Sequence, residues 1–233
     1  MAIVGAMDEE IAALLPCLDH ARRERRAGRD FHLGRLDGHD VVLVRCGIGK
    51  VAAATTAAVL LDAFGVGALV FTGVAGGLGA QVRVGDIVVA TSLLQHDMDA
   101  QPLFPRWEVP LTGRARFDAD ADLSDALAVA VRRIPGARLH QGLIVSGDRF
   151  VATRAESDVL RAALPDALAV EMEGAAVAQV CHDFGRPFAG VRTVSDRADD
   201  AAHGDFARFV ATVAAPYSRD IVRATLAAVE AGR

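Results

Sequence analysis

Aromatic residues are scarce in this chain: they make up 5% of its 233 residues, with one Trp and one Tyr. Apolar residues nevertheless account for 52%, so the sequence predicts a substantial core filled mostly by aliphatic side chains. That apolar content excludes a disordered protein. Because no linker, low-complexity segment or repeat interrupts a chain of this length, we expect a single domain over residues 1–233.

Cysteine is also sparse. Cys17, Cys46 and Cys181 are widely spaced, and no CxxC pair is present. An odd number of cysteines without metal-ligand spacing argues against a disulfide framework and against a zinc site. We therefore expect no bound metal and a reduced, cytoplasmic protein.

Positive charge does not dominate the chain: 25 basic residues stand against 30 acidic ones, a formal charge of −5. No basic face is expected to attract a phosphate backbone, which disfavours nucleic acid as a partner. The one basic cluster, Arg22–Arg26, is interpreted as a solvated surface segment. The longest apolar stretch, residues 67–80, is too short and too rich in glycine to span a bilayer, and the first residues lack the basic region of a signal peptide.

Patterns typical of strands and helices alternate along most of the chain. Short apolar runs such as Ala2–Ala6 and Ala167–Met172 predict buried strands, and apolar residues at helical spacing follow them. Asp37-Gly38 predicts a tight hairpin turn, because glycine tolerates positive φ. The alternation predicts an α/β fold: a central mixed, largely parallel twisted sheet flanked by helices.

Four of the predicted strands end in glycine or in polar residues, at positions 73–77, 146–148, 171–173 and 195–196. In open α/β sheets, ligands bind outside the carboxyl ends of the strands, so we expect these four clusters to converge on one crevice. The run Gly73–Gly79 does not fit the G-x-G-x-x-G pattern of dinucleotide sites. It is interpreted either as a packing turn or as a place where the backbone approaches a planar ligand closely.

The acids near these strand ends also have ordinary structural explanations. Glu10 lies in the first turn of a predicted helix, where the helix dipole favours acids. Asp196 has the position of an N-cap or turn residue, and Glu173 that of the first acid of a helix. However, an unpaired buried charge is costly, so acids at the end of an apolar strand also indicate a ligand.

Five ordered motifs, at residues 5–10, 47–53, 146–148, 170–173 and 195–196, carry a resemblance to a known family. Over nearly the whole chain they resemble the 5′-methylthioadenosine/S-adenosylhomocysteine nucleosidases, within the purine nucleoside phosphorylase and uridine phosphorylase superfamily. The resemblance implies a nucleoside phosphorylase-like fold, no cofactor and a homodimer. It also implies hydrolysis of the N9–C1′ bond of a small nucleoside (5′-methylthioadenosine, S-adenosylhomocysteine or 5′-deoxyadenosine) to adenine and a 5′-substituted ribose.

The resemblance further implies roles for twelve residues. Glu10 becomes the base that activates water, Asp196 the acid that protonates adenine N7, and Glu173 the ligand of the ribose hydroxyls. The other nine surround the substrate or orient these acids: Met172 packs on the ribose, Phe150 stacks on the purine, the Val151 backbone pairs with the adenine edge, Gly76 lies beside the base, Ile48, Met7 and Phe206 surround the 5′-alkylthio group, and Ser195 and Arg192 orient Asp196 and the water-side carboxylate.

The reaction explains why two separate acids are needed. Adenine is a poor anionic leaving group, and protonation at N7 makes it neutral, so an acid is required on the base side. Water must attack the opposite face of C1′, which requires a second carboxylate, as in inverting glycosidases. The chain departs from the family's pattern at Val74, where Ser or Thr is expected.

Three other functions stay open at the level of sequence. A phosphorylase of the same fold would bind phosphate, which the acids Asp8–Glu10 repel, although Arg45 is available. A nucleosidase could instead act on another 5′-substituted adenosine, such as aminofutalosine. A non-catalytic nucleoside-binding module would need neither acid nor base. In a dimer, the loop Asp99–Glu108 is a candidate to close the partner's 5′ pocket.

Overall fold

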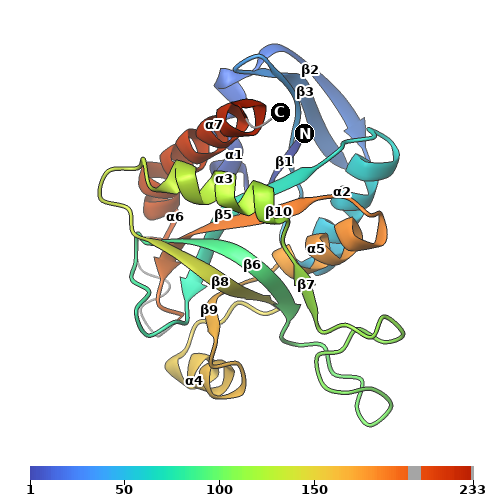
Figure 1. Ribbon diagram of the computed structural model, residues 1–233, viewed down its shortest axis with the longest axis vertical. Helices are drawn as coiled ribbons and strands as arrows, with labels where there is room; N and C mark the ends of the chain where they lie inside the picture. Colours follow the sequence, from blue (N-terminus) through green and yellow to red (C-terminus); the bar gives the residue numbers. More distant parts are fainter. Residues whose placement is uncertain (199–205, 232–233) are drawn as a thin grey trace.

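The computed structural model describes residues 1–198 and 206–231. Its strands form one mixed sheet covered by helices, which confirms the α/β fold predicted from the sequence (Figure 1). The strands of the described residues are β1 (Ala2–Gly5), β2 (Asp19–Arg26), β3 (Arg29–Leu36), β4 (His39–Arg45), β5 (Leu69–Gly77), β6 (Ile87–Gln95), β7 (Arg116–Asp118), β8 (Leu139–Ser146), β9 (Ala167–Glu171) and β10 (Phe188–Asp196).

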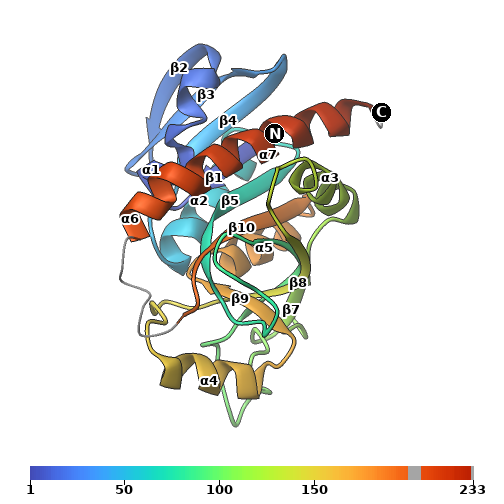
Figure 2. The same ribbon diagram turned by 90° about the vertical axis from the view of Figure 1, so that its left-hand side faces the viewer.

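The sheet closes on itself at one end. Its order is β10-β6-β8-β9-β5-β1-β4-β3-β2, with β7 paired to β6, and β10 pairs with β5 as well. Strands β5, β10, β6, β8 and β9 therefore form a ring, from which β1 to β4 extend (Figure 2). At the end of β5, Gly76 pairs with Val170 of β9 on one side and with Asp196 of β10 on the other. This closure brings three strand ends together.

Helices cover both faces of the sheet. Among the described residues they are α1 (Asp8–Ala12), α2 (Lys50–Asp62), α3 (Ala121–Val131), α4 (Arg154–Ala163), α5 (Gly174–Asp183), α6 (Phe206–Phe209) and α7 (Ala215–Ala231), with a 3₁₀ turn at Leu15–Cys17 and a π-helical segment at Val210–Ala214.

The alternation of side chains along β5 explains how the two faces acquire separate cores. Phe71 packs into a cluster with residues of α2 and α5, whereas Val70 packs into another cluster with residues of α3 and α7. Successive side chains of a strand point to opposite faces, so one continuous apolar run supplies both layers. No helix of the described ranges is both long enough and apolar enough to cross a bilayer.

Two expectations about local structure need correction. The glycine-rich segment expected as a turn is the second half of β5, which stays in the sheet to Gly77. Residues Arg22–Arg26 belong to the edge strand β2, whose side chains are mostly exposed as expected. Apolar alternation is missing there, and β2 is held instead by pairing with β3. The single domain over residues 1–233 stays a prediction.

Candidate active site

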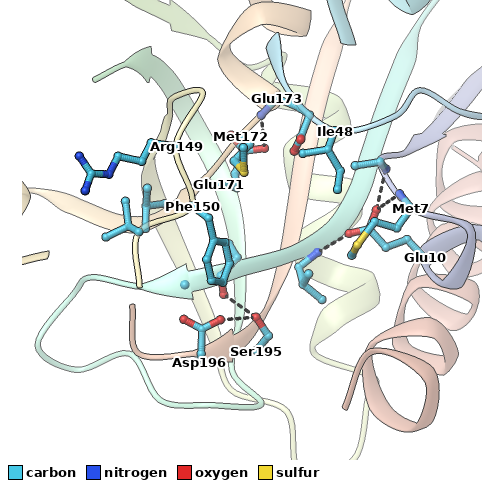
Figure 3. A pocket seen from close by; sticks show the side chains of 16 residues that line it. Met7, Glu10, Ile48, Arg149, Phe150, Glu171, Met172, Glu173, Ser195 and Asp196 are labelled. Carbon is cyan, nitrogen blue, oxygen red and sulfur yellow. Dashed lines mark hydrogen bonds between the residues drawn. The ribbon is translucent and has the colours of Figure 1, made fainter. Parts of the chain in front are cut away.

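A pocket opens where β1, β5, β9 and β10 end (Figure 3). Three of the four predicted polar clusters contribute lining residues; the cluster at 146–148 lies behind the wall, and the residues that follow it reach the pocket. The pocket is lined by Ala6, Met7, Glu10, Ile48, Val74, Ala75, Gly76, Arg149, Phe150, Val151, Val170, Glu171, Met172, Glu173, Ser195 and Asp196.

Ten of the twelve residues predicted for the site line this pocket. Of the other two, Arg192 lies buried beneath the wall, where it contacts Glu171. Phe206 begins α6, but its side chain lies outside the described residues.

Glu10 is held by the backbone around it. Its Oε2 accepts hydrogen bonds from the amides of Ala6 at 2.6 Å and Met7 at 2.9 Å, and its Oε1 accepts one from Val74 at 3.0 Å. Met7 is the N-cap residue of α1, and its bond to Glu10, three residues later, is that of a capping box. Glu10 therefore does lie in the first turn of a helix, as its structural explanation requires. Burial raises the pKa of Glu10 above its usual value, against the lowering effect of Arg192 and the three amides.

Two glycines make room for this carboxylate. A Cβ at Gly73 would stand 2.4 Å from Oε1 of Glu10, so the carboxylate would have to move, and a Cβ at Gly5 would stand 3.1 Å from the Cβ of Glu10. The glycine run therefore makes space for this acid, a role that the sequence analysis did not foresee. The sequence alone does not reveal this contact, since Gly73 and Glu10 are 63 positions apart (73 − 10).

Glu171 is paired within the protein. Its Oε2 accepts from Arg192 Nη2 at 2.7 Å and from the Gly174 amide at 2.8 Å, and Ser146 donates its hydroxyl to Oε1. Both side chains of the ion pair are 3% exposed. Arg192 also donates to the carbonyl of Phe71 and lies over the ring of that residue. Arg192 thus neutralises Glu171 directly, while its charge still lowers the pKa of Glu10.

Glu173 stands two residues further on and faces the pocket. Its Oε1 accepts one hydrogen bond, from the Gly49 amide at 2.8 Å. Burial raises the pKa of Glu173 to about 8; the charge of Glu171 adds to this effect, and the Gly49 amide and Arg192 oppose it. A buried carboxylate with so few donors is poised to accept hydrogen bonds from a ligand.

Asp196 lies at the opposite end of the pocket from Glu10 (Figure 3). Its Oδ1 accepts from the Ala198 amide at 2.7 Å, and the Ser195 hydroxyl lies 2.7 Å from its Oδ2. A Cβ at Gly76 would come within 3.0 Å of Oδ1, so this glycine makes space for Asp196. Ser195 and Gly76 therefore both adjoin Asp196.

Apolar side chains complete the pocket. Met7 lies near Glu10 and Ile48 beside Glu173, whereas Phe150 lies beside Asp196 and Ser195 (Figure 3). Phe150 is 44% exposed and Ile48 is 60% exposed in the chain by itself. Apolar groups of this size left open to solvent at a pocket mouth offer surface to an apolar or aromatic ligand.

Several lining residues were missed by the sequence interpretation. Ala6, Ala75 and Val170 are short apolar residues at strand ends, and nothing in their pattern distinguishes them from core. Arg149 is signalled only by its place next to Phe150; its guanidinium pairs with Glu156, outside the pocket. Val74, expected as a departure from the family, contributes its amide to Glu10.

Neither a metal site nor an anion site is apparent in the described part of the chain. No group of three or more potential metal ligands is found there. The pocket is lined by four acids and one arginine, and that arginine is already paired. Arg45, the cation considered for phosphate, pairs with Asp8 at 2.8 Å. The described lining therefore offers an anion no cation that is not already paired.

Comparison with known proteins decides the family. The Phosphorylase superfamily model matches residues 1–227. The 5′-methylthioadenosine/S-adenosylhomocysteine nucleosidase of Anoxybacillus flavithermus is 39% identical over 224 residues, 96% of each chain. The enzyme of the same name from Geobacillus kaustophilus is 39% identical and covers all of this chain and 98% of its own. The chain belongs to this nucleosidase family.

Solved structures of nucleosidases agree closely with the fold. The Neisseria meningitidis enzyme, in complex with methylthio-immucillin-A, matches with a TM-score of 0.92 and 38% identity, covering 97% of both chains. The Colwellia psychrerythraea enzyme, in complex with adenine, matches with a TM-score of 0.93 and 38% identity, covering 97% of this chain and 94% of its own.

Proposed function

We propose that this nucleosidase hydrolyses the N-glycosidic bond of 5′-thio-substituted adenosines, releasing adenine and the 5′-substituted ribose. The substrates are 5′-methylthioadenosine and S-adenosylhomocysteine, which the names of its relatives give for those proteins. The observation that carries the proposal is the placement of Glu10 and Asp196 at opposite ends of one pocket, with Glu173 between them (Figure 3).

Glu10 acts as the base. Its carboxylate takes a proton from water as the oxygen attacks C1′ on the face opposite the purine. The raised pKa of this buried acid supports the role, because a base is most effective when its pKa lies near the working pH. The three hydrogen bonds from backbone amides hold the carboxylate in one orientation.

Asp196 acts as the acid. As the C1′–N9 bond breaks, its proton moves to adenine N7, so that the base leaves neutral. Ser195, at 2.7 Å, and the Ala198 amide orient the carboxyl group. Each turnover leaves Glu10 with a proton and Asp196 without one, and exchange with solvent restores both. Water supplies the oxygen of the new C1′ hydroxyl, so no other reactant is consumed.

Glu173 binds the ribose hydroxyls. It has one donor, the Gly49 amide, so the sugar supplies the hydrogen bonds that this carboxylate lacks. Hydrogen bonds to a charged group contribute about 1.5–3 kcal/mol each. Hydrogen bonds from the ribose hydroxyls favour the ionised form of Glu173 in the complex, and its negative charge then stabilises the positive charge that develops on the sugar. Met172 packs beside the ribose, Phe150 on the purine, and Met7 and Ile48 around the 5′ group.

Water rather than phosphate is the proposed acceptor. A phosphate ion would meet the carboxylates of Glu10 and Glu173 whenever these acids are ionised, and like charges disfavour this. The one lining cation, Arg149, is paired with Glu156.

We also infer a homodimer and a cytoplasmic location. The exposed apolar side chains Ile48, Val51 and Leu103 lie at the pocket mouth, on the helix beside it and in the 99–108 loop, and they support a partner surface there. Leu103 is 83% exposed, whereas the Trp107 indole donates to the His96 carbonyl of its own chain. Three free cysteines support a reduced compartment.

A panel of 5′-substituted adenosines tests the function. The purified protein is incubated with 5′-methylthioadenosine, S-adenosylhomocysteine, 5′-deoxyadenosine, aminofutalosine and adenosine, with and without phosphate, and adenine is quantified. We expect adenine from the thio-substituted compounds at rates that phosphate does not change. Strict dependence on phosphate would contradict hydrolysis, and binding without release of adenine would indicate a silent module.

A further inference from the structure

Lys50 is the only lysine of the chain, which contains 24 arginines. It is the first residue of α2 and follows the turn after β4. Its ammonium lies 2.6 Å from Oδ1 of Asp97 and 3.0 Å from Oε1 of Gln95. The Lys50 side chain is 16% exposed, less than the arginine side chains of the surface ion pairs. A compact ammonium fits such a confined place between two oxygens, which a planar guanidinium does not.

The backbone of Lys50 belongs to the same cluster. Its amide donates to Oδ1 of Asp148 at 2.7 Å, and the amide of Asp148 donates to Oδ2 of Asp97 at 2.9 Å. The three residues thus form a closed ring of hydrogen bonds through Lys50, Asp97 and Asp148. The ring ties the start of α2 to the ends of β6 and β8, at the strand-end cluster 146–148 that does not line the pocket.

This ring is joined directly to the pocket through one residue. Gly49 precedes Lys50, adopts a φ of +96°, and donates its amide to Glu173 at 2.8 Å. A Cβ at Gly49 would stand 3.1 Å from Oδ1 of Asp148, so the turn fits tightly against the ring. Ile48, one position earlier, lines the pocket. The donor that holds Glu173 is therefore placed by contacts made at Lys50.

We propose that Lys50, through its ion pair with Asp97, is a positioning residue that fixes the 47–50 turn and thereby aims the Gly49 amide at Glu173 and Ile48 into the pocket. Lys50 does not line the pocket, so it acts on sugar binding through Glu173 and leaves Glu10 and Asp196 unaffected. The inference rests on the proposed function of Glu173 as the ribose ligand.

A positioning role predicts a change that a purely structural role does not. Burial raises the pKa of Glu173 most, the charge of Glu171 raises it further, and Arg192 and the Gly49 amide lower it; Glu10 adds a smaller raising effect. If the turn moves and the Gly49 amide no longer donates to Glu173, the pKa of Glu173 rises further. The pH at which Glu173 ionises therefore reports where the Gly49 amide points.

The first test is Lys50→Met, compared with Arg223→Met as a control. Arg223 pairs with Asp37 through two bonds of 2.7 Å on the surface and touches no pocket residue. For Lys50→Met we expect KM for 5′-methylthioadenosine to rise about tenfold, the equivalent of one weakened hydrogen bond to a charged group, with kcat within about twofold. The acid limb of the kcat/KM profile should move to higher pH. The control should leave all three unchanged.

A double-mutant cycle with Asp97→Asn guards against a variant that folds poorly. If Lys50 acts through this ion pair, Asp97→Asn gives the same direction of change, and the double variant is no worse than Lys50→Met alone. Additive effects on KM, or equal losses of kcat and of folded protein with an unchanged pH profile, would overturn the proposal.

The titration of Glu173 separates this proposal from the proposed function. Carbon-13 NMR of the side-chain carboxyl, in the unliganded protein and in Lys50→Met, follows the ionisation without any turnover. A higher midpoint in Lys50→Met supports positioning even if the wild-type protein releases no adenine. An unchanged midpoint refutes positioning even if the enzyme is fully active.

Discussion

Glu171 and Glu173 are the same residue type, two positions apart, yet the fold treats them in opposite ways. Glu171 accepts bonds from Arg192, Gly174 and Ser146 and lies in an ion pair sealed from solvent. Glu173 accepts one bond, from Gly49, and its pKa is raised to about 8, mostly by burial. One acid is satisfied by the protein, and the other is the acid that we propose binds the ribose.

The different bonding of Glu171 and Glu173 shows how several buried acids can lie around one pocket in a folded protein. Among the described residues, Arg192 is the one buried cation near these acids, and its direct partner is Glu171. Glu10 and Glu173 therefore remain with raised pKa values, a condition that the protein relieves by proton uptake and a substrate relieves by hydrogen bonding. Replacing an acid that is bonded within the protein should lower the free energy of unfolding, whereas replacing an acid that we propose contacts the substrate should lower activity.

The largest effect is expected for the two acids assigned to chemistry. Glu10→Gln and Asp196→Asn should each lower kcat about a thousandfold, because each removes one proton transfer while keeping side-chain size. Isothermal titration with a non-hydrolysable 5′-thioadenosine analogue should still detect binding. A kcat within tenfold of wild type in either variant would refute the role given to that residue.

Glu171→Gln should be the variant that damages the fold. It leaves the Arg192 guanidinium buried without a counter-charge, which costs about 3 kcal/mol of unfolding free energy. Below pH 4.5, where Glu173 carries its proton in both the folded and the unfolded chain, Glu173→Gln should change stability by less than about 1 kcal/mol, because its backbone amide partner can still bind the new side chain. Urea unfolding measures both; equal losses would remove the distinction between the two acids.

The pH dependence of stability should separate the acids next. Glu173 in the folded protein keeps its proton to about pH 8, whereas in the unfolded chain it ionises near the ordinary value of 4.5. The folded state then binds more protons, so stability is full below pH 4.5 and falls as pH rises towards 8, by at most about 1.4 kcal/mol per pH unit. The difference between wild type and Glu173→Gln in urea should follow this slope. If the unfolding free energy of wild type, relative to that of Glu173→Gln, rose with pH, the raised pKa of Glu173 would be contradicted.

The smallest effect tests the space around Glu10. Gly73→Ala places a Cβ 2.4 Å from the present position of Oε1 of Glu10, so the carboxylate must turn. We expect kcat to fall about tenfold, close to 1.4 kcal/mol, with KM little changed. Gly67→Ala is the matched control, because nothing lies within 4 Å of its added Cβ. Loss of activity in both variants would point to strand stability instead.

Much of the fold could be predicted from local patterns. The hairpin at Asp37-Gly38, the α/β alternation and the strand ends at 171–173 and 195–196 follow from turn chemistry and apolar periodicity. The edge strand β2 could not be predicted this way, because its charged residues carry no apolar alternation. The closure of the sheet is likewise a long-range pairing, of β5 with β10, that no local pattern encodes.

The site was predictable where chemistry limits the residue type. Glu10, Glu173 and Asp196 are acids where a soluble fold rarely needs them, and motif order assigned them to one family. The partner of each acid was not predictable, since the amide of Val74 and the amide of Gly49 are brought in from distant turns. Spacing in sequence carries no information about such contacts; they follow from the packing of the sheet ends.

The stereochemistry of the product tests the central claim most directly. If Glu10 delivers water to the face of C1′ opposite the adenine that Asp196 protonates, the reaction inverts the configuration at C1′. Proton NMR of 5′-methylthioadenosine hydrolysis at high enzyme concentration, recorded before the sugar anomers equilibrate, should then show the α anomer first. A first-formed β anomer, or a sugar phosphate, would contradict the account.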